Sequence, residues 1–177
     1  MGRFTSLEMC AGAGGQALGI ELAGFEHEAL VEIEPPACAT LRLNRPQWDV
    51  REEDLRLFNG LPYYGVDLVA GGVPCPPFSK AGQQLGEADE RDLFPEAIRL
   101  VDESRPKAVM LENVRGLMDA RFDDYRRKVE DQLTHLVTKP VGVCSMHLTM
   151  VFRNFAPEWC ALVSAKSYPN TSHGQSL

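Results

Sequence analysis

The sequence predicts an α/β fold with a mostly parallel, doubly wound sheet. Short apolar runs typical of buried strands alternate at least four times with segments of helical spacing, which is the pattern of βαβ units. A glycine-rich loop follows the first predicted strand, and chemically unusual residues follow three later ones. Ligands of such sheets bind at the carboxyl ends of the strands, so the sequence also predicts where a site would lie.

The elements follow one another along the chain. Strands are predicted over 4–9, 27–34, 66–72 and 107–113, and helices over 16–25, 35–44, 93–104 and 122–136. In the first helix Leu18, Leu22 and Phe25 fall on or near one face. Pro35 suits the start of the second helix, and Pro95 fits the first turn of the third. The run VDLVAGG is nearly all apolar, as expected of a strand buried on both faces.

Composition limits the functions that the chain can have. The 177 residues suit one domain, and 44% of them are hydrophobic, which is enough for a substantial core. The net charge of −7 argues against a protein whose main task is to coat nucleic acid. Five cysteines without a CxxC pair and four scattered histidines predict neither a disulfide framework nor a metal site. No apolar run is long enough to span a membrane, and we expect a cytoplasmic location.

Two strand ends carry residues suited to a nucleoside. The loop CAGAGGQALG lets a ligand approach the backbone, although small residues also serve helix–strand packing. In VEIE, Glu32 or Glu34 can accept hydrogen bonds from both hydroxyls of a ribose, and each alone could equally be a solvated acid. Asp54 in REEDL could reach an adenine amino group, but by itself it is more typical of a surface acid.

A third strand end holds one thiol in a stiff loop, GGVPCPPFS. Pro74, Pro76 and Pro77 fix three φ angles around Cys75 and remove three hydrogen-bond donors. A buried cysteine is usually structural, yet packing does not require three prolines around a thiol. The pattern therefore favours a positioned nucleophile at Cys75.

The fourth strand end, LENV, places a carboxyl group after an apolar run. Glu112 at the mouth of a buried strand suits a proton-donating role, and Asn113 follows it. The alternative is that these residues cap a helix or loop.

These motifs together resemble the DNA cytosine-5 methyltransferases over roughly residues 4–136. The nucleophile motif of that family matches Pro74, Cys75, Pro77, Phe78 and Ser79; its Glu-Asn-Val motif matches Glu112, Asn113 and Val114; and its cofactor loop matches Ala11 to Gly15. The chain departs from the family pattern at three positions, with Cys10 for phenylalanine, Glu8 for aspartate and Pro76 for glutamine.

The resemblance implies a Rossmann-like S-adenosylmethionine-dependent methyltransferase fold, incomplete at the C-terminus. It implies that S-adenosyl-L-methionine binds at Cys10, Ala11, Gly12, Gly14, Gly15, Glu32, Ile33, Asp54 and Leu55. It implies a catalytic set of Cys75, Glu112, Pro74, Asn113 and Ser79, with no metal. The Cys75 thiolate would add to carbon 6 of a flipped cytosine in double-stranded DNA, and Glu112 would donate a proton to ring N3. The loop 80–91, predicted to be a mobile surface loop, could close over the base.

The resemblance ends near Leu136. We expect a catalytic domain over 1–136 and a divergent segment over 137–177, truncated or frameshifted, with neither the family's arginine motif nor its target-recognition domain. The sheet would then lack its last strands and expose an apolar edge. We therefore expect the chain alone to methylate DNA poorly and a complementary subunit to carry the recognition domain; a companion restriction enzyme is in keeping with this class.

Three alternatives remain at this level. An amino-methyltransferase acting on adenine N6 or cytosine N4 also uses a Pro-Pro-aromatic loop, here 76–78, but needs a side-chain acceptor before the prolines and no thiol. The chain could instead be a non-catalytic fragment or a subunit of a split methyltransferase. A nicotinamide-dependent oxidoreductase would need a hydride-handling His or Tyr, for which the sequence offers no candidate.

Overall fold

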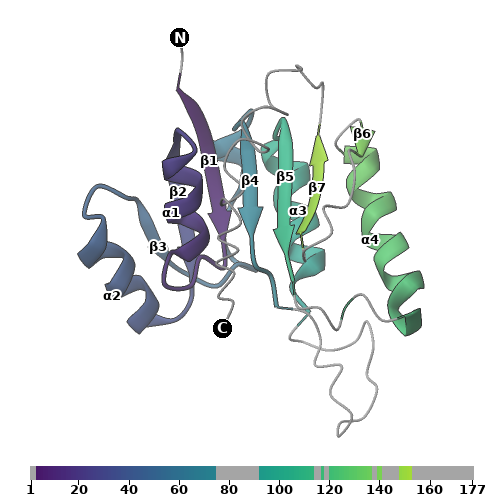
Figure 1. Ribbon diagram of the computed structural model, residues 1–177, viewed down its shortest axis with the longest axis horizontal. Helices are drawn as coiled ribbons and strands as arrows, with labels where there is room; N and C mark the ends of the chain where they lie inside the picture. Colours follow the sequence, from purple (N-terminus) through teal and green to yellow (C-terminus); the bar gives the residue numbers. More distant parts are fainter. Residues whose placement is uncertain are drawn as a thin grey trace, which may run out of the picture.

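The computed structural model contains a single seven-stranded sheet with helices on both faces (Figure 1). It describes residues 3–74, 92–113, 117 and 120–136, and the strands at 139–140 and 148–152. The strands are β1 (Phe4–Met9), β2 (Phe25–Glu32), β3 (Val50–Glu52), β4 (Leu68–Gly71), β5 (Ala108–Glu112), β6 (Lys139–Pro140) and β7 (Leu148–Phe152). Their order across the sheet is β3-β2-β1-β4-β5-β7-β6, and the first five are parallel. The predicted doubly wound parallel sheet is confirmed.

The helices cover the sheet from two sides. They are α1 (Gly15–Leu22), α2 (Pro35–Asn44), α3 (Phe94–Ser104) and α4 (Asp123–Leu136), with short 3₁₀ turns η1 (Leu61–Tyr63) and η4 (Ala120–Phe122). Buried residues of α1 and α2 pack on one face, and those of α3 and α4 pack on the other. The bounds of α2, α3 and α4 agree with the predicted helices to within one residue, because their apolar spacing and proline starts are local signals.

The sheet differs from the prediction at the end of β2, at β3, which was not predicted, and at β6 and β7. The second strand ends at Glu32 rather than 34, because the N-cap of α2 is Glu34. The strands β7 and β6 extend the sheet antiparallel beyond β5, with Glu112 opposite Leu148 and Ala108 opposite Phe152. β5 is therefore not an edge of the sheet, since β7 takes up its backbone hydrogen bonds.

The alternation of side chains along β1 separates the two faces. Leu7 and Met9 are fully buried in the main core, beside residues of α3 and α4. Ser6 and Glu8 point to the opposite face, where α1 lies. Burial of each large apolar side chain contributes about 1.5–3 kcal/mol, so the α3–α4 face supplies most of the hydrophobic stabilisation.

The carboxyl ends of β1 and β4 lie at the topological switch point of the sheet. The chain leaves β1 toward β2 on one side, and β4 lies on the other, so this is the point where the strand order reverses. The two strands are closely packed here, because a Cβ atom on Gly71 would lie 2.4 Å from Cγ of Met9. Glycine at this position is therefore required by the contact between the strands.

Candidate active site

The glycine loop after β1 is held in a left-handed backbone conformation. Cys10, Gly12 and Gly14 have φ angles of 53°, 55° and 90°. A Cβ on Gly14 would lie 2.6 Å from Cδ2 of Leu41, whereas one on Gly12 or Gly15 would meet nothing within 4 Å. The loop thus packs against α2 at Gly14 and leaves open space above Gly12 and Gly15, where a ligand can approach the backbone.

The carboxylate of Glu32 ties this loop to the end of β2. Its Oε2 accepts a hydrogen bond of 2.6 Å from the Gly12 amide, and its Oε1 accepts bonds from the amides of Ile33 and Glu34 at 2.8 and 2.9 Å. The side chain is only 8% exposed. A carboxylate offers about four acceptor sites, so these three amides leave one for a further donor such as a ribose hydroxyl. Of the two predicted candidates, Glu32 is the one beside the glycine loop, while Glu34 is exposed.

Asp54 lies close to the same loop. Its Oδ1 accepts a 2.9 Å hydrogen bond from the Arg56 amide, and the two side chains form an ion pair at 3.2 Å. Burial, together with the nearby negative charges of Glu32 and Asp54, raises the pKa of the Cys10 thiol to about 12. Cys10 is therefore a protonated thiol within reach of both acids, and it is not a nucleophile.

The remaining predicted cofactor residues lie at the same edge. Ile33 is 54% exposed at the end of β2, whereas Leu55 is buried below Asp54. Three features of this edge suit a nucleoside: the open space above the glycine loop, the acceptor site left on Glu32 and the carboxylate of Asp54. S-adenosylmethionine has a ribose, an adenine amino group and a charged arm, and the residues present fit these groups.

Two hydrogen bonds hold Val73 and Pro74, which we call the stem because they join β4 to the predicted nucleophile loop. The side-chain amide of Asn113 donates to the carbonyl of Val73 at 2.7 Å, and the backbone amide of Leu93 donates to the carbonyl of Pro74 at 3.2 Å. The two carbonyls before Cys75 are therefore fixed by β5 and by the start of α3. Cys75 itself, Ser79 and the loop 80–91 lie outside the described residues.

Glu112 ends β5, which is the parallel neighbour of β4, as predicted from the strand-end positions of the two motifs. A Cβ on Gly72 would lie 3.3 Å from Oε2 of Glu112, so the carboxylate is next to the backbone that leads to the thiol. The side chain of Glu112 is exposed. The strand end opens toward solvent and leaves Glu112 accessible to a substrate.

Sequence analysis missed a residue that supports this stem, Asp92. Its Oδ1 accepts a 3.0 Å bond from the Phe94 amide at the start of α3, and its Oδ2 accepts a 2.6 Å bond from the Tyr125 hydroxyl of α4. An aspartate two residues before a helical segment is a recognisable capping signal. Its partner in α4, 33 residues away, could not be read from the sequence.

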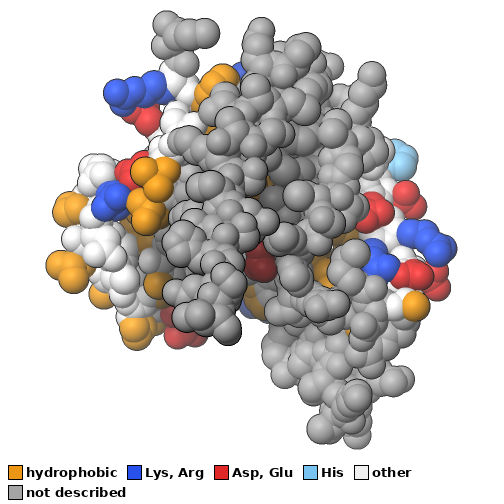
Figure 2. Space-filling view, viewed as in Figure 1, with side chains coloured by type: hydrophobic (Ala, Val, Ile, Leu, Met, Phe, Trp, Pro, Cys, Tyr) orange, Lys and Arg blue, Asp and Glu red, His pale blue; other side chains and the backbone are white. Residues whose placement is uncertain are grey.

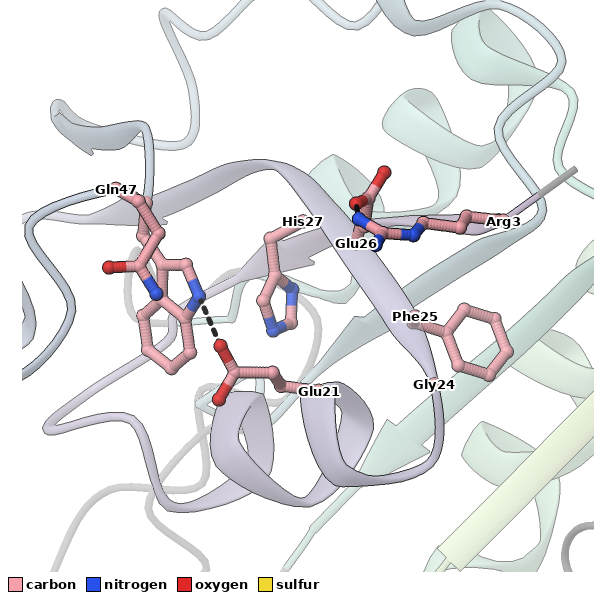
Figure 3. A pocket seen from close by; sticks show the side chains of 8 residues that line it. Arg3, Glu21, Gly24, Phe25, Glu26, His27 and Gln47 are labelled. Atoms are coloured by element: carbon pink, nitrogen blue, oxygen red, sulfur yellow. Dashed lines mark hydrogen bonds and ion pairs between the residues drawn. The ribbon is translucent and has the colours of Figure 1, made fainter.

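A separate hollow of about 590 Å³ lies at the opposite end of the sheet, where Arg3 precedes β1 and Phe25 begins β2. Figure 3 shows Glu21 and His27 among the residues that line it. The Trp48 indole donates a 3.2 Å hydrogen bond to Glu21, and its ring meets the His27 ring edge-on. The two acids that line the hollow form ion pairs, Glu21 with Arg45 and Glu26 with Arg3. The hollow is therefore remote from the carboxyl edge that carries the motifs.

The surface has no single electrostatic character in the view of Figure 2. Apolar side chains gather on the side of α1 and α2, where Leu18, Leu22 and Leu43 are exposed, and charges of both signs mix on the side of α4. Within the described residues, no helix is long and apolar enough to cross a membrane. The same part of the chain contains no group of three or more residues arranged to hold a metal ion.

The comparisons with known proteins agree with this architecture. Residues 4–136 match the family described as C-5 cytosine-specific DNA methylase. The chain is 69% identical over 134 residues to the type II methyltransferase M.NgoMIV of Neisseria gonorrhoeae, covering 76% of this chain and 43% of that protein. It is 53% identical over 133 residues to M.NaeI of Lentzea aerocolonigenes, covering 73% and 32%. Among solved structures, the S. pombe Dnmt2 methyltransferase matches with a TM-score of 0.68 at 18% identity, covering 96% of this chain and 57% of that one. The chain thus spans less than half the length of these curated relatives.

Proposed function

Since the chain belongs to the C-5 cytosine-specific DNA methylase family, we propose that it forms the S-adenosylmethionine-binding and catalytic part of a DNA cytosine-5 methyltransferase. The proposal rests mainly on one observation, which is that the four strands followed by the motifs end at the same edge of the sheet. Glu32 and the glycine loop lie at the ends of β2 and β1, and the stem of the Cys75 loop and Glu112 lie at the ends of β4 and β5. One edge of the sheet can therefore hold a methyl donor beside a nucleophile and an acid.

The proposed chemistry begins with the Cys75 thiolate. Its sulfur forms a bond to carbon 6 of cytosine, and Glu112 protonates ring N3 as electron density develops there, so that carbon 5 becomes nucleophilic. S-adenosylmethionine, when bound, supplies the methyl group for carbon 5. Loss of the carbon 5 proton to a base then expels Cys75, and N3 returns its proton to Glu112, which restores the aromatic ring. The base must leave the duplex for this to happen, at a cost of a few kcal/mol.

The supporting residues have separable roles in this proposal. Asn113 holds the Val73 carbonyl and so sets where the Cys75 loop departs from β4. Pro74 restricts the backbone just before the thiol, and Ser79 follows it in the same motif. Glu32, Asp54, Ile33 and Leu55 would bind the nucleoside of the cofactor over the glycine loop.

The DNA substrate is proposed to need more than this chain. The net charge is −7, and the described surface seen in Figure 2 mixes both signs. Little long-range attraction for DNA is therefore available from the chain itself. We assign the catalytic role to residues 1–136, and we propose that a complementary polypeptide carrying the recognition domain acts with it in the cytoplasm.

A covalent trap tests the function. DNA containing 5-fluorocytosine, mixed with S-adenosylmethionine and the chain, with and without the complementary polypeptide, should give a protein–DNA adduct detected by mass, because fluorine blocks the release of the cysteine. Cys75→Ser should abolish the adduct, and Cys144→Ser should leave it unchanged. Methylation of DNA without an adduct, and with Cys75→Ser still active, would instead identify an amino-methyltransferase.

A further inference from the structure

The side chain of Arg99, on α3, binds the segment that follows Asp54. Its Nη2 donates to the Leu55 carbonyl at 2.8 Å, and its Nη1 donates to the Phe58 carbonyl at 3.1 Å. The same guanidinium binds the carboxylates of Glu96 and Glu103, both at 2.7 Å. The planar, multiply donating guanidinium can serve two carbonyls and two carboxylates at once, and a lysine ammonium cannot reproduce this geometry.

A second contact brings the same segment against α3. The amide of Gly60 donates to Oε2 of Glu103 at 2.7 Å. A Cβ on Gly60 would lie 2.9 Å from that oxygen and 3.0 Å from Cδ2 of Leu100. Gly60 has a φ of −83°, which any residue adopts, so glycine is required here by the close approach to α3 and not by the backbone conformation.

The segment is stiff where it starts. The carbonyl of Asp54 accepts hydrogen bonds from the amides of Leu57 and Phe58, and its side chain accepts one from the Arg56 amide. A displacement of Leu55 or Phe58 would therefore move Asp54 as well. Asp54 in turn lies beside the end of β2, because the amide of its neighbour Glu53 donates to the Glu32 carbonyl at 3.0 Å, and its charge acts on the Cys10 thiol.

We propose that Arg99 is a positioning residue for the nucleobase end of the cofactor, acting through Leu55, Phe58 and Asp54. This proposal rests on the proposed function. Arg99 fixes the distance between Asp54 and the glycine loop, so that the Asp54 carboxylate meets the adenine amino group while Glu32 holds the ribose. Helix α3 also binds the Pro74 carbonyl through the Leu93 amide, so one helix sets the position of both the adenine end and the catalytic stem.

Binding calorimetry with two ligands tests this role. S-adenosylhomocysteine carries the 6-amino group that Asp54 would accept, and its 6-oxo counterpart, S-inosylhomocysteine, does not. The wild-type chain should prefer the amino form by about tenfold or more, as expected for loss of a hydrogen bond to a charged group. Arg99→Met and Gly60→Ala should each weaken binding of the amino form by about tenfold and bring the ratio of the two affinities close to one. Affinity for the 6-oxo form should change little.

The controls separate positioning from general destabilisation. Arg45→Met removes another partly buried arginine, which pairs with Glu21 and lies over Trp48, and should leave the ratio unchanged. Arg99→Lys keeps a positive charge beside Glu96 and Glu103 but should restore the ratio only in part. Thermal unfolding of each variant shows whether it is folded at the temperature of the titration.

The outcomes are distinct. A collapsed ratio in Arg99→Met and Gly60→Ala, with Arg45→Met unchanged, supports the positioning role. Equal weakening of both ligands, or no weakening in folded variants, overturns it while leaving the proposed function intact. A wild-type chain that bound neither ligand would overturn the proposed function itself, and this proposal with it.

Discussion

Two buried carboxylates flank the glycine loop, and the protein treats them in opposite ways. Glu32, 8% exposed at the end of β2, accepts three backbone hydrogen bonds. Glu8, fully buried in β1 between Leu30 of β2 and Ala70 of β4, has no hydrogen-bond partner for either oxygen among the described residues. The two acids lie on neighbouring strands, so the difference comes from their immediate surroundings.

The contrast shows that hydrogen bonds, and not depth alone, decide whether a buried acid can carry charge. Burial raises the pKa of Glu8 from 4.5 to about 8. The Ala17 backbone opposes this shift, but it forms no hydrogen bond of ordinary geometry with the carboxyl group. Glu8 is therefore held as a neutral acid at moderate pH, whereas the donors around Glu32 suit a carboxylate. The family resemblance places an aspartate at the position of Glu8, so the longer side chain reaches further under α1.

The largest expected effect concerns the charge of Glu8. Folding raises the pKa of Glu8 from 4.5 to about 8. The contribution of this group to the free energy of unfolding is therefore complete below pH 4.5 and is lost as the pH rises through about 8. The difference between these two pKa values corresponds to on the order of 5 kcal/mol. Glu8→Gln should remove most of this dependence, because the amide stays neutral. Denaturant unfolding from pH 5 to 9 measures it.

Glu28→Gln is the matched control for Glu8, because Glu28 is exposed on the adjacent strand β2. It should leave the pH dependence as in the wild type. If the stability of Glu8→Gln still fell by several kcal/mol between pH 5 and 9, burial of Glu8 would not be its cause.

The next largest effect is expected when Glu32, the acid with three hydrogen bonds, is removed. Glu32→Ala leaves the amides of Gly12, Ile33 and Glu34 without their acceptor, and the expected loss is about 2–3 kcal/mol of stability because charge-assisted bonds are removed. Cofactor affinity should fall as well, since the ribose loses its acceptor. Unfolding and calorimetry measure the two losses. Glu34→Ala, at the exposed neighbour, should change cofactor affinity far less; equal losses in both variants would contradict the assignment to Glu32.

A smaller effect is expected from a change in the glycine loop itself, with Glu32 left in place. Gly12→Ala should cost about 1 kcal/mol of stability because φ is +55°, where a side chain is disfavoured. Its methyl group would point into the open space above the loop and should reduce cofactor binding by much more than the loss of stability suggests. Calorimetry on the folded variant measures this, and unchanged affinity would show that the cofactor lies elsewhere.

The smallest effect belongs to His27, on the same face of the sheet as Glu8. Its Nε2–H donates to the Ala17 carbonyl and its Nδ1 accepts from the Ser6 hydroxyl, both at 2.9 Å, so the neutral ring is the one that fits. Burial lowers its pKa below 6.5, so its contribution to stability is complete above pH 6.5 and is lost as the pH falls below that value, opposite to the trend from Glu8. Glu8→Gln compared with Glu8→Gln/His27→Gln at pH 5.5 and 7 isolates this term. An equal response to pH in both would rule it out.

The sequence was most informative where the signal is local. The starts and ends of α2 and α3 could be predicted because prolines and apolar spacing act within one or two helical turns. The placement of the motif-bearing acids at one edge of the sheet followed from the alternation of strand and helix, since parallel strands bring their carboxyl ends together. The choice of Glu32 over Glu34 needed the structure, in which β2 ends at Glu32. The motifs at those ends were enough by themselves to predict the family.

Only the tertiary structure decided how those residues are held. The three residues of β3 and the antiparallel strand β7 carry no pattern strong enough to predict, because short strands form only where a neighbouring edge accepts their hydrogen bonds. The exposure of Glu112, the unpartnered burial of Glu8 and the binding of Leu55 and Phe58 by Arg99 join residues that are distant in sequence, or depend on what packs above them. Burial and long-range hydrogen bonds are properties of the assembled sheet and helices, so a sequence can name these residues without showing which of them will carry charge.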